Sequence, residues 1–589
     1  MGARWPGRVA LGVFLLQFVA LDVASRGARD LGLRRALACV ASVALLSALV
    51  LLARSKPARV VLAVAAGAVF VLQAFAIRYY HAPFDVQSAR SARRAWGDVG
   101  PTLLHVAPAF LGLTLAAALA EWLLLVPMAS VRPRSRRLLL AVAALALAVS
   151  PPLREGTPEA RAASMAAALI EHRPTIPKGT VALPLLPSRR ARLPSILLVV
   201  TESVRAEDYC RSPAEPCDVA PAVHAALPTR VPLRELRAVA SYTTISVGAI
   251  VTGRTQIATL HDLAFMPNLF DFAGQIQTRG EKMRAGYWGA HIGSGVFERP
   301  QIGEGLDRYV AEETLPELAE GAPDPGLDRR VVDVFERDLP ALSGPLVAML
   351  HLYGTHVPYV FDDATAPYKP FRRAVTWEHL DELHAAYRNA IRAQDVEIAR
   401  AIRVFLRSRE GQPWLIVLTS DHGEAFGEHH AIHHGQNLYD EQIHVPGFIA
   451  WSEGLLDDDQ THALRAAEGA PTSHLDLLPT LLDALGVWDS VALGPFRHRM
   501  VGRSLLAPAP PRPRQLPMTS CNESFPCPQN TWGMLGDRYA LVAQSWDGGF
   551  HCVPLDDSGA PAAWNAECEA LRIRSRETFP LLPSGKANE

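Results

Sequence analysis

The chain has 589 residues, which is more than one compact domain usually holds. Its formal net charge is −1, with 58 Lys and Arg against 59 Asp and Glu, so it lacks the basic excess typical of nucleic-acid-binding proteins. Hydrophobic residues make up 49 % of the chain, and their excess is concentrated before position 152. This uneven distribution predicts a transmembrane domain, 1–152, joined to a soluble part.

The first part of the chain contains five apolar stretches long enough to be considered as membrane spans, at about 9–25, 36–53, 60–77, 102–128 and 138–152. Arg4 and Arg8 precede the first stretch, but no clear cleavage site follows it, so we interpret it as an anchor. The basic cluster at 132–137 favours a cytoplasmic N-terminus. Five spans would then place the rest of the chain outside the cytoplasm.

The spacing of the cysteines also indicates that the soluble part lies outside the cytoplasm. Six of the seven cysteines lie in the soluble part and fall into close pairs, which are Cys210 with Cys217, Cys521 with Cys527, and Cys552 with Cys568. Close pairs in even number predict disulfides in an oxidising compartment. A zinc site is the alternative, although these spacings are longer than those of the usual zinc knuckle.

The soluble part alternates predicted strands and helices. Residues 153–194 are expected to form a juxtamembrane helix and an extended, basic, proline-rich linker. Helical patterns cover 378–408 and 474–486. Continuous apolar runs predict buried strands at 195–201, 285–292, 346–351 and 414–419. We therefore expect an α/β catalytic domain with a mostly parallel central sheet at 195–510, followed by a disulfide-containing subdomain at 511–589.

Acidic residues follow two of these predicted strands. Glu202 comes directly after 195–201, and Asp421 and His422 come after 414–419. Ligands bind at the carboxyl ends of strands in such sheets, and carboxylate and imidazole groups are suitable ligands for one divalent ion. A single carboxylate after a strand is more often a cap or a solvated loop residue, but two such positions with a histidine favour a metal site.

A candidate nucleophile lies in the segment SYTTISVGAIVTGR. Thr243 or Thr244 would open a helix whose N–H groups attract an anionic phosphate. A hydroxyl is a weak nucleophile unless it is activated, and metal coordination is one means of activation. Taken alone, the two threonines would be an ordinary helix N-cap.

Two histidine-containing motifs follow. In HLYGTHVPY, His351 and His356 are both expected to reach a substrate oxyanion. In EHHAIHHG, His430 and His434 would share a helical face, which would permit a separate zinc site. A solvated loop with one functional histidine is the alternative that we favour.

The order of these motifs resembles the sulfatase-like, membrane-anchored phosphotransferases of the alkaline phosphatase superfamily. These include lipoteichoic acid synthase, phosphoglycerol transferase and phosphoethanolamine transferase types. The resemblance covers about 193–510 by motif and includes SHLDLLPTLLDALG. It implies metal ligation by Glu202, Thr243, Asp421 and His422, catalysis by Thr243, His356 and His434, and substrate binding by His356, His434 and Arg299.

The implied function is a metal-dependent transferase, using Zn²⁺ or Mn²⁺, in a bacterial-type inner membrane with its catalytic domain on the periplasmic or extracellular side. It would move a phosphoglycerol or phosphoethanolamine group from a membrane phospholipid to a cell-envelope glycan or lipid acceptor through a phosphothreonine. Nucleic acid is not an expected partner. Arg299 and the absence of cysteines between 218 and 520 favour a phosphatidylglycerol-type donor.

Two alternative functions belong to different classes. The first is hydrolysis of a phosphoester or sulfate ester at the same site. Ordinary sulfatases use a Cys or Ser that becomes formylglycine, whereas Thr243 stands at that position here, which argues against sulfate-ester chemistry. The second alternative is a non-catalytic membrane binding or sensor protein.

Overall fold

The computed structural model divides the chain into two compact units, which consist mainly of the residues up to Thr175 and of Ile176–Gln544 with Gly549–Glu589. The structure describes residues 55–80, 107–120, 122–123, 183–210, 217–257, 263, 266–278, 281–289, 306–311, 326–435, 437–520, 531–544, 549–555, 563–579 and 586–587.

The first unit contains helix α3, Lys56–Tyr80. Its stretch Lys56–Phe75 is the one segment of the described residues long and apolar enough to cross a membrane, by length and composition. A shorter apolar helix covers Ala107–Ala120 and approaches α3 so closely that a Cβ at Gly67 would meet the Ala118 backbone. These helices correspond to the third expected stretch and part of the fourth. The other three expected stretches lie outside the described residues, as does most of the expected linker.

The second unit is built around a seven-stranded sheet in the order β3-β13-β10-β2-β9-β7-β8. The five strands from β10 to β8 are parallel, while β13 pairs antiparallel with β10 and β3 pairs antiparallel with β13 at that edge. The strands are β2 (Ser195–Thr201), β3 (Val231–Pro232), β7 (Arg284–Gly289), β8 (Arg308–Val310), β9 (Leu346–Leu352), β10 (Trp414–Ser420) and β13 (Gly447–Trp451). The four predicted strands are therefore present in a mostly parallel sheet, as expected.

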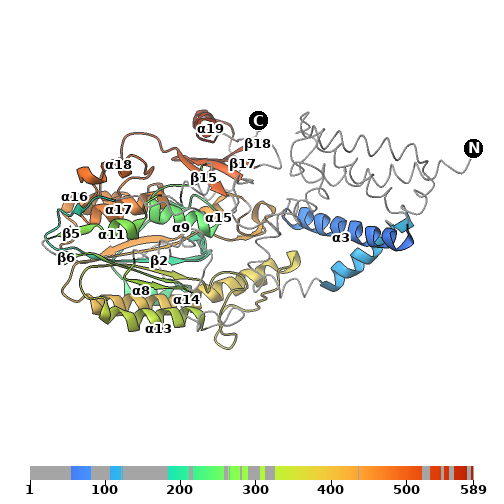
Figure 1. The fold of residues 1–589 in the computed structure, drawn as a ribbon, viewed down its shortest axis with the longest axis horizontal. Coiled ribbons are helices and arrows are strands. Elements are labelled where there is room, and N and C mark those ends of the chain that lie inside the picture. Colours follow the sequence, from blue (N-terminus) through green and yellow to red (C-terminus); the bar gives the residue numbers. More distant parts are fainter. Residues whose placement is uncertain are drawn as a thin grey trace, which may run out of the picture. The chain divides into compact units, whose positions relative to one another are not determined.

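Helices cover both faces of this sheet (Figure 1). One face carries α8 (Pro221–Ala226), α13 (Leu327–Asp338) and α14 (Leu380–Ser408), and the other carries α9 (Thr243–Thr252), α11 (Leu269–Ala273) and α17 (Leu477–Ala484). Strand β2 explains the two layers, because Leu197 and Val199 enter one apolar core while Leu198 and Val200 enter the other. A strand that is buried on both faces has a nearly continuous apolar run, which is the pattern at 196–200.

Further short elements complete the second unit. The predicted helix at 474–486 forms as a 3₁₀ turn, His474–Asp476, followed by α17. The remaining elements outside the C-terminal sheet are β1 (Leu186–Pro187), β4 (Leu236–Arg237), β5 (Ile276–Thr278), β6 (Glu281–Lys282), β11 (Ala425–Phe426), β12 (Ile432–His433), β14 (Thr472–Ser473), α15 (Asp440–Ile443), α16 (Asp458–Ala466) and α18 (Gly494–Arg497).

The end of the chain forms a second sheet with one helix. Its elements are β15 (Leu516–Ser520), β16 (Thr531–Leu535), β17 (Tyr539–Gln544), β18 (Gly549–Pro554), β19 (Lys586–Ala587) and α19 (Ala566–Thr578). A disulfide between Cys552 and Cys568 joins β18 to α19, and a second disulfide joins Cys210 to Cys217. Two of the three expected disulfides are thus present, and the pair at 521 and 527 lies outside the described residues.

Candidate active site

The register of two parallel strands brings the acidic residues of the site together. Ser420 of β10 pairs with Thr201 of β2, so Asp421 and Glu202 both emerge at the carboxyl ends of adjacent strands. The Asp421 N–H donates to the Thr201 carbonyl, which continues the pairing by one step. Both carboxylates are fully buried. This is the position at which open parallel sheets bind their ligands.

Thr243 joins these carboxylates from the first turn of α9. Its Oγ1 donates to Glu202 Oε1 at 3.0 Å and lies 3.2 Å from His422 Nε2. The helix ends at Gly253, whose φ of +65° is a conformation that glycine adopts without strain. The predicted helix is therefore present, and it holds Thr243 rather than Thr244 against the acidic pair.

His422 presents one ring nitrogen to the two carboxylates. Its Nδ1–H donates to the Gly423 carbonyl at 2.9 Å, which turns Nε2 toward the carboxylates. That Nε2 lies 3.3 Å from Glu202 Oε1 and 3.2 Å from Asp421 Oδ2. Two buried carboxylate oxygens, Glu202 Oε2 and Asp421 Oδ2, accept no hydrogen bond within the described part of the chain.

The charges of this cluster favour a cation at its centre. Burial and the neighbouring Glu202 charge raise the pKa of Asp421 to about 6. Burial lowers the pKa of His422, but the nearby carboxylates of Asp421 and Glu202 outweigh it and raise that pKa to about 9. Two adjacent buried carboxylates repel each other unless positive charge lies between them. A bound divalent ion would supply that charge.

The residues therefore fit a divalent metal ion. Ligand atoms of Glu202, Asp421 and His422 all lie within 4.8 Å of one another. Glu202 Oε1, Asp421 Oδ2 and His422 Nε2 face one another and form the mixed oxygen and nitrogen donor set that such ions prefer, with the ion replacing the proton on Nε2.

The two histidines expected to contact substrate lie beside this cluster. The rings of His356 and His434 are 5.3 Å apart, and the ring of His434 is 4.2 Å from that of His422. Glu202, His356 and His434 each offer an atom within 4.8 Å of the others. Nδ1 of His356 donates to the Val357 carbonyl at 2.7 Å.

Glu424 contacts His434, and the sequence patterns did not indicate this functional contact. Its Oε1 lies 3.1 Å from His434 Nδ1, and the Glu424 carboxylate is fully buried. Burial lowers the pKa of His434 well below its ordinary value, so this imidazole is neutral near pH 7. The sequence signal that could have indicated this role is the place of Glu424 in Asp-His-Gly-Glu, two residues after the metal-binding candidate His422.

Three expectations about other candidate residues are not borne out by the described structure or lie outside it. His351 was expected to reach substrate, but it lies within β9, is 2 % exposed and faces the protein interior, so that expectation is wrong. His430 and His434 do not share a helical face, because the segment forms a 3₁₀ turn, Glu428–His430, and the short strand β12. Arg299 lies outside the described residues.

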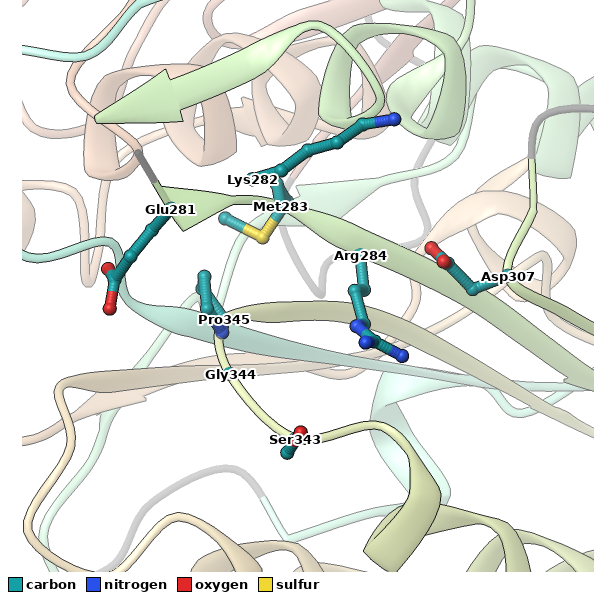
Figure 2. Close-up of a pocket in the computed structure, with 8 residues that line it drawn as sticks. All are labelled: Glu281, Lys282, Met283, Arg284, Asp307, Ser343, Gly344 and Pro345. Atoms are coloured by element: carbon teal, nitrogen blue, oxygen red, sulfur yellow. The ribbon is translucent and has the colours of Figure 1, made fainter. Parts of the chain in front are cut away.

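One open cavity lies away from this cluster. It has a volume of about 420 Å³ and is lined by Arg284, Pro345 and their neighbours (Figure 2). Arg284 begins β7 and Pro345 precedes β9, so the cavity lies at the amino ends of these strands. Ligand sites of parallel sheets form at the opposite ends, and Figure 2 shows no cluster of converging side chains there.

Comparison with known proteins identifies the domain that carries the candidate site. The sulfatase family model matches residues 194–487. The chain contains a sulfatase-family domain. This result confirms the resemblance found in the sequence and the alkaline-phosphatase-like α/β fold.

Individual relatives match shorter stretches. An uncharacterized sulfatase, YidJ, from Escherichia coli strain K12 is 33 % identical over 88 residues, which cover 15 % of this chain and 16 % of YidJ. The phosphatidylethanolamine transferase Mcr-1 from Escherichia coli is 32 % identical over 151 residues, which cover 24 % of this chain and 27 % of Mcr-1. The matched stretches thus span less than a third of each relative.

A solved structure shows the same fold over a longer part of the chain. It is the integral membrane protein lipooligosaccharide phosphoethanolamine transferase A from Neisseria meningitidis. The alignment has a TM-score of 0.55 and 14 % identity, and it covers 82 % of this chain and 96 % of that protein.

Proposed function

We propose that this protein is a membrane-anchored, metal-dependent phosphotransferase that moves a phosphoethanolamine or phosphoglycerol group from a phospholipid to a cell-envelope acceptor. The observation that carries the proposal is the position of Thr243 Oγ1 between Glu202 Oε1 and His422 Nε2. A threonine at this point of a sulfatase-family domain cannot become formylglycine, so it is suited to forming a phosphate ester itself.

The metal-binding residues in this proposal are Glu202, Asp421 and His422, with the Thr243 hydroxyl as the fourth ligand. We favour Zn²⁺ over Mn²⁺ because four ligands that include an imidazole are typical of zinc sites. The bound ion would lower the pKa of the coordinated hydroxyl and neutralise negative charge on the phosphate.

In the first half-reaction, Thr243 Oγ attacks the phosphorus of the phospholipid. A bond from Oγ to phosphorus forms, and the bond from phosphorus to the diacylglycerol oxygen breaks. The Thr243 hydroxyl proton points to Glu202 Oε1, which accepts it as the oxygen attacks. The leaving oxygen takes one proton from His356, because neutral His434 is a poor proton donor, so diacylglycerol and a phosphothreonine are the products.

In the second half-reaction, the acceptor hydroxyl attacks the same phosphorus. Neutral His434, held by Glu424, accepts the acceptor's proton and returns one to His356, and the Thr243 oxygen leaves and takes back the proton held by Glu202 Oε1. The N–H groups of the first turn of α9 stabilise the phosphate oxygens in both steps. Water in place of the acceptor would turn the same steps into hydrolysis.

A membrane location follows from the substrate and from the chain. Helix α3 has a stretch that is long and apolar enough to anchor the protein, and the disulfides fit an oxidising compartment such as the periplasm. Anchoring raises the effective concentration of a lipid donor at the site without requiring new contacts. The name of the relative Mcr-1 favours phosphatidylethanolamine over phosphatidylglycerol as the donor.

The test is single-turnover incubation of the purified full-length protein with each labelled phospholipid. We expect release of diacylglycerol and a phospho-adduct at Thr243 detected by peptide mass spectrometry, with phosphatidylethanolamine preferred. Thr243→Ala should give neither product. Release from phosphatidylglycerol alone would reverse the donor preference.

Absence of both products with either lipid would contradict the proposed transfer. Rapid turnover of a soluble phosphodiester in the same preparation would instead identify a hydrolase. A zinc titration provides a separate check, because Asp421→Asn should lose tight Zn²⁺ binding while the protein stays folded.

A further inference from the structure

His351 is a buried polar side chain that the reaction above does not use. It is 2 % exposed and lies on β9, between Val200 of β2 and Gly289 of β7 in the strand register. A histidine at such a position costs free energy unless its ring nitrogens have partners. The contacts of its two nitrogens indicate why it is there.

The first nitrogen contacts a tyrosine on the neighbouring strand. Tyr287 Oη lies 3.2 Å from His351 Nδ1. A Cβ at Gly289 would overlap the Tyr287 hydroxyl, so this hydroxyl can occupy its place only because residue 289 has no side chain. Tyr309 of β8 stacks on Tyr287 with ring centroids 5.6 Å apart, which fixes the tyrosine ring from the other side. The geometry around the hydroxyl is therefore closely defined.

The second nitrogen faces the metal-binding carboxylate. His351 Nε2 lies 3.6 Å from Glu202 Oε2, and both atoms are buried without a hydrogen bond in the described structure. If the tyrosine O–H donates to Nδ1, the imidazole proton is on Nε2 and points toward Glu202 Oε2. This contact is longer than a hydrogen bond but attractive in a buried, weakly screened environment.

We propose that Tyr287 and His351 are positioning residues that orient Glu202 for metal binding. They hold Oε2 and thereby turn Oε1 toward Thr243 and His422. This inference rests on the metal site of the proposed function. It adds His351, which contacts the ligand Glu202, and Tyr287, which contacts His351.

The experiment measures Zn²⁺ affinity of the full-length protein by competition with a fluorescent chelator. Orienting partners of metal ligands typically contribute 10–100-fold in affinity. We expect His351→Leu to weaken Zn²⁺ binding by roughly that factor and Tyr287→Phe to weaken it by roughly tenfold. His351→Gln keeps a donor toward Glu202 and should retain affinity within a few-fold of wild type.

A double variant separates positioning from packing. If the tyrosine acts through the histidine, Tyr287→Phe should add nothing in the His351→Leu background. Tyr368→Phe is the matched control, because it removes a hydroxyl bonded to Asp218 on the exposed surface and should not change Zn²⁺ affinity. Excess Zn²⁺ should restore kcat in the His351 and Tyr287 variants with KM for the lipid unchanged.

Two results would overturn the inference. The first is wild-type Zn²⁺ affinity in a folded Tyr287→Phe protein, a variant that loses only one oxygen atom and serves even if His351→Leu does not fold. The second is full additivity of the two substitutions. Failure of the underlying metal site is distinguishable, because Glu202→Gln would then also leave Zn²⁺ binding unchanged.

Discussion

Thr243 Oγ1 lies 3.0 Å from Glu202 Oε1, although the two residues are 41 positions apart. Glu202 follows the end of β2, and Thr243 is the first residue of α9. The contact therefore requires the end of this strand and the start of this helix to meet at the site. The neighbouring Thr244 is also buried, at 1 % exposed against 8 % for Thr243, and Thr243 makes the hydrogen bond to Glu202. This difference between adjacent threonines gives the first prediction.

Thr243→Ala should abolish transfer while leaving the fold intact. Loss of a nucleophile costs on the order of 10⁴-fold or more in kcat, because the covalent step cannot occur. Thr244→Ala is the adjacent control and should retain much of the activity. Diacylglycerol release and circular dichroism measure the two properties. Activity that survives in Thr243→Ala and is lost in Thr244→Ala would move the nucleophile by one residue.

Asp421 should make the stability of the metal-free protein depend on pH. Burial and the Glu202 charge raise its pKa from 3.8 to about 6, so the folded protein binds this proton more tightly than the unfolded chain does. The favourable contribution is complete below about pH 4 and is lost as the pH rises through about 6. At pH 8 the buried negative charge of Asp421 costs about 3 kcal/mol.

The variant Asp421→Asn tests this effect, because the amide oxygen can still accept the N–H groups of Ser203 and His422. In chelator-treated protein, the variant should unfold at a higher temperature than wild type at pH 8, and the difference should disappear toward pH 4. Saturating Zn²⁺ should reverse the order at pH 8. A wild type that is the more stable of the two at pH 8 without metal would contradict the electrostatic account.

Much of this site follows from local sequence patterns. The strands that end at Thr201 and Ser420 each contain a continuous apolar run, and an acidic residue directly after each strand is the ordinary sign of a strand end beside a site. His351 could have been assigned correctly, since it lies within the apolar run at 346–351 rather than after it. Its contact with Tyr287 was not predictable, because it depends on the order of β7, β9 and β2 in the sheet.

The histidine-rich segment shows why periodicity alone can mislead. His430 and His434 are four positions apart, which is helical spacing, but Gly427 and Gly435 bound the segment with positive φ values. His429, His430 and His433 also have positive φ, so the backbone turns repeatedly instead of continuing a helix. His434 reaches the site from a loop whose shape the sequence pattern did not reveal.

The disulfides predict the compartment of the catalytic domain. Cys552 and Cys568 join β18 to α19 across 16 positions, and closing a loop of this size contributes about 3 kcal/mol. Replacing both cysteines by serine should lower the unfolding temperature of the oxidised protein, with no change under reducing conditions. A reporter fused at the C-terminus should be active only outside the cytoplasm. Six free thiols in protein from intact cells would contradict this topology.

Asp328 should control the position of His356 from a distance. It lies in the first turn of α13, where its Oδ1 accepts the Tyr353 N–H at 2.9 Å and its Oδ2 accepts the Gly354 N–H at 3.0 Å. Gln394 of α14 donates to the same Oδ2 at 2.8 Å. A buried carboxylate thus satisfies two backbone groups of the turn that leads from β9 to His356.

Asp328→Ala should leave these N–H groups without partners and cost about 2–4 kcal/mol of stability. The turn would relax, so kcat should fall by more than the loss of folded protein explains, with Zn²⁺ affinity preserved because Asp328 contacts no metal-binding residue. Gln394→Ala is the matched control, since it removes one donor and leaves both backbone bonds. If kcat per folded molecule in Asp328→Ala equals that of wild type, His356 does not depend on this turn for its position.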